Sequence, residues 1–151
     1  LLIKYWIYNR EIINFFSSDH KNIKKIFFFG VASAIFLTLH SIFLGIKFDI
    51  QIYKLLRRVV LLLFIIFEII AQGILVYHFF KIKNKLAGLI NKKILILKIV
   101  LVSILATVAI LSLPILLNKD NTHFKHALEW NYFVGVILFY LFSRFFWRRT
   151  T

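Results

Sequence analysis

Two of the chain's six acidic residues lie inside long apolar stretches, where an ionisable side chain is costly. Glu68 is about ten residues into the stretch 59–80, and Gln72 follows one turn later, so both would share a helix face. An ionisable group near the centre of a membrane costs about 2.5–3.5 kcal/mol on insertion scales, and desolvation favours the neutral acid. This pair therefore has three candidate roles: helix packing through hydrogen bonds, ligand or ion binding, and proton handling.

Further polar residues would lie in the same outer half of a membrane if the chain crosses it four times. They sit near the ends of the apolar stretches that this topology brings to one side. The alternative is a purely structural role, in which these polar side chains hydrogen-bond across helices and stabilise helix packing. The candidate ligand or ion pocket consists of His40, Glu68, Gln72, Ser112, His126, Glu129 and Trp130.

A weak metal-site pattern occurs where His123, His126 and Glu129 follow one another at intervals of three residues. Helical geometry would bring these three ligand types toward one face. The absence of cysteine excludes thiolate metal sites, Fe–S clusters and disulfides. A bis-histidine haem would need His40 and His78, which the topology places near opposite membrane surfaces. No specific motif implies a cofactor, so the cofactor is unknown.

Motifs of soluble enzymes are missing: there is no Gly-rich phosphate loop, no nucleophile elbow and no HExxH sequence. Two basic residues lie within the apolar stretches near their ends, Lys98 and Arg144. Long basic side chains in such positions usually extend to the membrane surface, and we expect both to do so.

The elements that must position these residues are transmembrane helices. Hydrophobic residues make up 61% of the 151 residues, and charged residues only 17%. A soluble chain of this size could not bury so much apolar surface. A bilayer core needs about 20 apolar residues per helix. Four stretches satisfy this requirement, namely 26–46, 59–80, 94–117 and 127–147, which predicts an all-α polytopic membrane protein with a single membrane domain spanning 1–151.

Residues 1–16 differ from these four stretches because they are amphipathic. Lys4, Arg10, Glu11 and Asn14 fall within about a third of a helical wheel. We expect a helix lying in the membrane interface, with Tyr5, Trp6 and Tyr8 at headgroup depth. The alternative is one end of a further transmembrane helix. The chain has no Met and begins at Leu1, which leaves room for a preceding segment.

The orientation follows from basic residues between the stretches. The N-terminal segment, the 81–93 loop and the C-terminal tail carry thirteen Lys or Arg, whereas the loops 47–58 and 118–126 carry six. The positive-inside rule therefore puts both termini on the cytoplasmic or matrix side. A Lys-rich, Ile- and Phe-rich composition is typical of AT-rich genomes and favours a bacterial or organellar inner membrane. The net charge of +14 reflects these loops, so we expect no nucleic-acid partner.

One segment carries a family resemblance. The sequence HALEWNYF at 126–133 opens the last stretch with Glu129 and Trp130, and Arg57 and Arg58 precede the second stretch. A Glu-Trp pair at the head of a final membrane helix resembles the DRAM/Sfk family of polytopic membrane proteins, whose members have five or six spans rather than four. The resemblance implies a non-enzymatic protein of lipid organisation or trafficking.

Three functions remain open from the sequence. The first is a small helical-bundle membrane protein without catalytic activity that works through lipid or protein contacts. The second is a membrane subunit of a larger transport or respiratory complex, with intramembrane ion- or proton-handling residues. The third is a membrane enzyme with an outward-facing polar site. The expected partners are membrane lipids and, in the second case, other membrane subunits.

Overall fold

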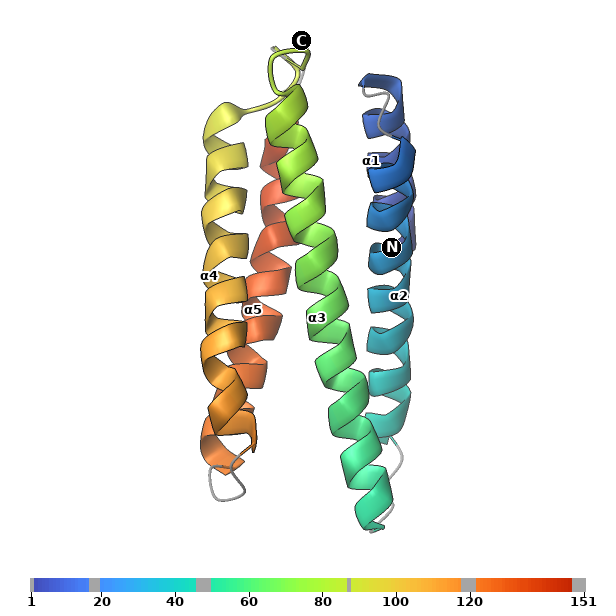
Figure 1. Ribbon diagram of the computed structural model, residues 1–151, viewed down its shortest axis with the longest axis vertical. Coiled ribbons are helices and arrows are strands. Elements are labelled where there is room, and N and C mark those ends of the chain that lie inside the picture. Colours follow the sequence, from blue (N-terminus) through green and yellow to red (C-terminus); the bar gives the residue numbers. More distant parts are fainter. Residues whose placement is uncertain (1, 17–19, 46–49, 87, 118–121, 148–151) are drawn as a thin grey trace. The chain divides into compact units, whose positions relative to one another are not determined.

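The computed structural model describes residues 2–16, 20–45, 50–86, 88–117 and 122–147, and the side chains of 20–22, 54, 113–117 and 122–126 lie outside the description. The chain is all-α, as predicted. Its helices in these ranges are α1 (Leu2–Phe16), α2 (His20–Gly45), α3 (Gln51–Ile82), α4 (Lys92–Leu117) and α5 (Thr122–Phe146), shown in Figure 1.

Three described helical segments are long and apolar enough to cross a membrane. They are Ile23–Gly45 of α2, Gln51–Ile82, and Lys92–Ser112 of α4. The fourth predicted stretch also forms a helix, α5. Its described part is less apolar because Glu129, Asn131 and Arg144 interrupt the run.

The helices extend beyond the apolar stretches that predicted them. α3 begins at Gln51, eight residues before the expected start at 59, and so includes Arg57 and Arg58. α2 begins at His20, six residues before the expected start at 26. Arg, Lys and Gln have high helix propensity, so a helix need not end where its apolar run ends.

The chain divides into two compact units, Leu1–Leu75 and Val76–Thr151, called unit 1 and unit 2 below. The division falls inside α3. Unit 1 therefore contains α1, α2 and most of α3, while unit 2 contains the last turns of α3 together with α4 and α5.

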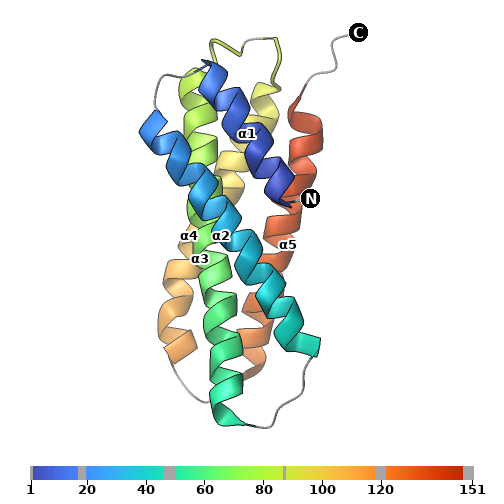
Figure 2. The ribbon, with the colours of Figure 1, turned by 90° about the vertical axis from the view of Figure 1, so that its right-hand side faces the viewer.

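In unit 1, α1 packs closely on the first half of α2, as Figure 2 shows. Trp6, Asn9 and Ile13 form the buried face of α1 at the i, i+3, i+7 spacing of a helix. Trp6 lies against Gly30, and the Arg10 guanidinium lies 4.5 Å from the Phe27 ring centroid, so the two helices run antiparallel.

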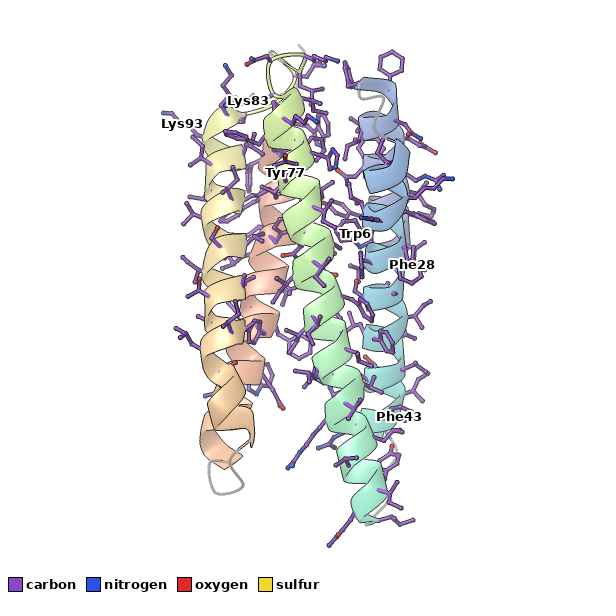
Figure 3. All side chains as sticks on the ribbon, in the orientation of Figure 1. Trp6, Phe28, Phe43, Tyr77, Lys83 and Lys93 are labelled. Atoms are coloured by element: carbon purple, nitrogen blue, oxygen red, sulfur yellow. The ribbon has the colours of Figure 1, made fainter. Side chains whose placement is uncertain are left out.

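Trp6 is fully buried, and Figure 3 shows it turned inward while Phe28 of α2 points outward. Its location at headgroup depth stays a prediction. Gly30 lies seven residues after Ile23, the start of the apolar segment of α2, which is about 10 Å along a helix. Gly30 admits the indole ring because it has no side chain.

In unit 2, α4 packs on α5, and the start of α4 is joined to the end of α5. Asn91 caps α4 by accepting the Lys93 amide on its Oδ1 atom at 3.1 Å. The Asn91 amide donates to the Phe146 carbonyl at 2.8 Å, and Ile90 forms an antiparallel bridge with Trp147. Gly88, with φ of 97°, allows the turn before α4. This end of unit 2 is therefore held by backbone contacts.

Candidate functional site

Glu68 lies in a fully buried cluster of hydrogen-bonded side chains in unit 1. Its Oε1 accepts a hydrogen bond from Gln72 Nε2 at 2.8 Å, one turn along α3. Its Oε2 lies 2.6 Å from the Ser33 hydroxyl of α2. Glu68, Gln72 and Ser33 each have no exposed surface. The structure thus brings the predicted Glu68 and Gln72 together and links them to α2 through Ser33.

The cluster connects to α1 through Gly30. The Ser33 hydroxyl lies 2.8 Å from the Gly30 carbonyl oxygen, and the Trp6 ring covers Gly30. All three helices of unit 1 therefore meet near Glu68. Phe67, beside Glu68, stacks on Phe36 at 5.4 Å between ring centroids and contacts Phe29 at 5.5 Å, which adds apolar contacts between α2 and α3.

His40 is buried in α2 but lies two helical turns beyond Ser33. A seven-residue interval keeps His40 on nearly the same helix face and moves it about 10 Å along the axis. His40 is therefore separate from the Glu68 cluster.

Lys98 corrects a sequence expectation, because its side chain does not extend to the surface. Lys98 is 2% exposed, and its Nζ donates to Ser143 Oγ of α5 at 2.7 Å. The ammonium lies 4.2 Å from the Phe139 ring centroid and 5.2 Å from that of Phe146. Ring faces attract a cation, and the Ser143 hydroxyl donates its own proton to the Phe139 carbonyl at 3.2 Å, which leaves a lone pair for Lys98. These contacts within unit 2 thus take the place of the water molecules that would solvate the Lys98 amine at a surface. Arg144, by contrast, is exposed.

Ser112, a predicted pocket residue, lies at a contact between α4 and α5. Its hydroxyl donates to the Ala109 carbonyl at 2.9 Å, and its side chain is also hydrogen-bonded to Tyr132. The Tyr132 hydroxyl donates to the Leu105 carbonyl at 3.0 Å. Ser112 therefore contributes to the packing of α4 on α5 through these hydrogen bonds.

Replacing Tyr132 with Phe should weaken unit 2 only slightly. The change keeps the ring and removes the hydroxyl, which bonds to the Leu105 carbonyl and to Ser112. Hydrogen bonds between membrane helices average about 0.6 kcal/mol in mutant cycles, with a maximum near 1.7. Denaturation of the protein in mixed micelles should show a loss of about this size; a loss well above it would mean that the hydroxyl supports more than these two contacts.

The remaining predicted site residues belong to α5. Glu129 is partly buried, whereas Trp130 is 72% exposed. The His123 and His126 side chains lie outside the described residues, so the metal hypothesis stays a prediction. No group of three potential metal ligands occurs among the described residues. The pocket draws on both units, which are described separately, and as a whole it also stays a prediction.

Sequence reasoning missed Ser33 and Ser143, the partners of the two buried ionisable groups. A signal for Ser33 exists: Gly30 and Ala34 form a small-xxx-small pattern, which is typical of close helix contacts in membranes. Ser143 has a weaker signal. It lies one turn after Phe139 and three residues before Phe146, so the three residues share a face.

No family model, curated protein or solved structure matches the chain. The resemblance of segment 126–133 to the DRAM/Sfk family therefore remains an expectation from sequence.

Proposed function

We propose that the chain is a small helical-bundle membrane protein without catalytic activity, which works through contacts with lipids and other proteins in the bilayer. The observation that carries this proposal is the contrast between the inside and the outside of its helices. Glu68 and Lys98 are engaged in hydrogen bonds within their own units. The outward surfaces carry large apolar residues, among them Ile35, Ile42, Leu62, Ile66, Val100, Ile104, Ile110 and Leu111, each at least 39% exposed.

Many large apolar side chains exposed on the outside of a protein are unfavourable in water and favourable in lipid. Soluble monomers rarely expose apolar patches larger than a few hundred square ångströms. Buried polar groups that are already bonded to protein favour a packing role over a reactive one. Both features support a protein whose outer surface is its working surface.

We further propose that α5 forms a fourth span. Its 25 residues extend about 37 Å, which exceeds the thickness of a hydrocarbon core of about 30 Å. Val134, Ile137, Leu141 and Phe145 form an exposed apolar stripe at helical spacing. Tyr132, Val136, Phe139 and Phe146 are buried. This division suits a helix with one face on lipid and the other on α4.

Four spans put both termini, and the turn between α3 and α4, on one side. That turn and its flanks carry Lys81, Lys83, Lys85, Lys92 and Lys93, of which Lys83 and Lys93 are labelled in Figure 3. The positive-inside rule makes this the cytoplasmic side of a bacterial inner membrane or the matrix side of an organellar one. The C-terminal end of α1, where Glu11 and Asn14 are exposed, would lie near the same surface, because α1 runs antiparallel along the first half of α2.

Cysteine labelling can test this topology cleanly because the chain has no native cysteine. Lys85→Cys should react with a membrane-impermeant maleimide only from the cytoplasmic side of sealed vesicles, and Gln51→Cys only from the opposite side. Both positions are exposed. Labelling of the two variants from one side would exclude the four-span arrangement.

The contact function is tested by mass spectrometry of the protein released from its own membrane in mild detergent. We expect masses of the chain with bound phospholipid or with further membrane chains in fixed ratio. Ile104→Ser and Ile137→Ser should reduce that retention because both side chains are exposed, while Val102→Ala, at a buried position, is the matched control. A lipid-free monomer as the only species would contradict the proposal.

A further inference from the structure

The oxygen atoms around Glu68 pose a proton-counting problem. Ser33 Oγ lies 2.8 Å from the Gly30 carbonyl oxygen and 2.6 Å from Glu68 Oε2. Both distances are within the range of O–H···O hydrogen bonds. A hydroxyl has a single proton to donate, and a carbonyl oxygen has none. Two hydrogen bonds along this line of three oxygens therefore need a second proton, and Glu68 is the member that can carry it.

We propose that Glu68 is a buried proton-binding site, in which the protonated carboxyl donates from Oε2 to Ser33 Oγ. Ser33 then donates its own proton to the Gly30 carbonyl oxygen. Glu68 Oε1 remains the carbonyl oxygen of the acid and accepts from Gln72 Nε2 at 2.8 Å. Every one of these contacts has one donor and one acceptor.

Gln72 supplies an independent observation. Its Oε1 atom is buried and receives no hydrogen bond from any described residue. The amide thus turns its donor toward Glu68 and adds one more acceptor to the cluster. Because Glu68 Oε1 already pairs with this donor, Oε2 is the oxygen that carries the proton toward Ser33 Oγ.

The site has the chemistry of a proton carrier, and its place near the middle of α3 puts it deep in a candidate span. The contact function proposed above does not require this proton, so the two proposals can fail separately.

A hydrophobic carbodiimide tests the site in the full-length protein. The reagent reacts with protonated carboxyls: the acid proton moves to one carbodiimide nitrogen, the carboxyl oxygen adds to the central carbon, and rearrangement gives a stable N-acylurea that retains the whole reagent. We expect one adduct, which peptide mapping places on Glu68. Glu68→Gln should abolish it, and the matched variant Glu129→Gln should retain it.

Infrared spectroscopy provides a readout that does not depend on reagent access. The wild-type spectrum minus that of Glu68→Gln should contain the carbonyl stretch of a protonated carboxylic acid. Gln72→Leu should raise the frequency of this band, because Oε1 loses its donor. The appearance of carboxylate bands instead of the acid band would overturn the proposal. So would protection from the carbodiimide by sodium chloride but not by choline chloride, because the ligand would then be a metal cation.

Discussion

Alanine at position 30 should separate α1 from α2. A Cβ atom on Gly30 would lie 2.6 Å from Cε2 and Cγ of Trp6, and closer still to Cδ2. These are atoms of a rigid ring, so the indole or the helix must move. Overpacking of this kind typically costs about 1–3 kcal/mol. The single-tryptophan variant Trp130→Phe, Trp147→Phe can report the change: Trp6 fluorescence should become accessible to an aqueous or lipid-borne quencher.

Gly135→Ala is the matched control. A Cβ atom there would meet Leu105 Cδ2 at 2.5 Å and Cδ1 at 3.1 Å, which are the ends of a flexible side chain. Leu105 can rotate, so the loss of stability should be smaller than at Gly30, and Trp6 should stay shielded. Equal quenching of Trp6 in the wild type and in Gly30→Ala would show that the indole does not depend on the absence of a side chain at position 30.

Ser143→Ala should destabilise unit 2 strongly as long as Lys98 is present. The change removes the oxygen that accepts from the buried ammonium. A buried donor without a partner costs about 1–3 kcal/mol, and more when it is charged. The same substitution in a Lys98→Met background should cost little, since methionine fills a similar volume and needs no acceptor. Denaturation in mixed micelles would measure all four proteins of this double-mutant cycle.

The coupling between the two positions is the decisive quantity. Residues in direct contact show interaction energies of about 0.5–3 kcal/mol, whereas independent sites add within about 0.5 kcal/mol. A cycle with no measurable coupling would contradict the assignment of Ser143 as the acceptor for Lys98. Lys98→Met alone should be well tolerated, because it leaves no buried charge and the Ser143 hydroxyl keeps its hydrogen bond to the Phe139 carbonyl.

Much of the architecture could be predicted from the sequence. The long apolar runs predicted an all-α chain, and three of them proved to be helices that could span a membrane. Helix limits were less predictable, because charged residues with good helix propensity continue α3 back to Gln51. The pairing of Glu68 with Gln72 was also predictable, since a four-residue interval in a helix brings two side chains to one face.

The partners of the buried groups were not predictable in the same way. Glu68 bonds to Ser33, thirty-five residues away, and Lys98 to Ser143, forty-five residues away. Which serine meets which charge depends on how two helices are rotated and aligned along their axes. Those quantities are set by packing, such as Trp6 on Gly30 and Phe67 on Phe36.

Glu68, the residue that first suggested chemistry, shows where the division lies. Its burial in an apolar helix and its neighbour Gln72 follow from one-dimensional spacing, because a helix repeats every 3.6 residues and lipid selects apolar runs. Its contact with Ser33 follows only from the tertiary structure, because hydrogen bonds between helices need atoms placed within a few tenths of an ångström. The same holds for Lys98. Its position in the sequence predicted a side chain that extends to the membrane surface. The packing of α4 on α5 instead places the Ser143 hydroxyl and two aromatic rings around its Nζ atom.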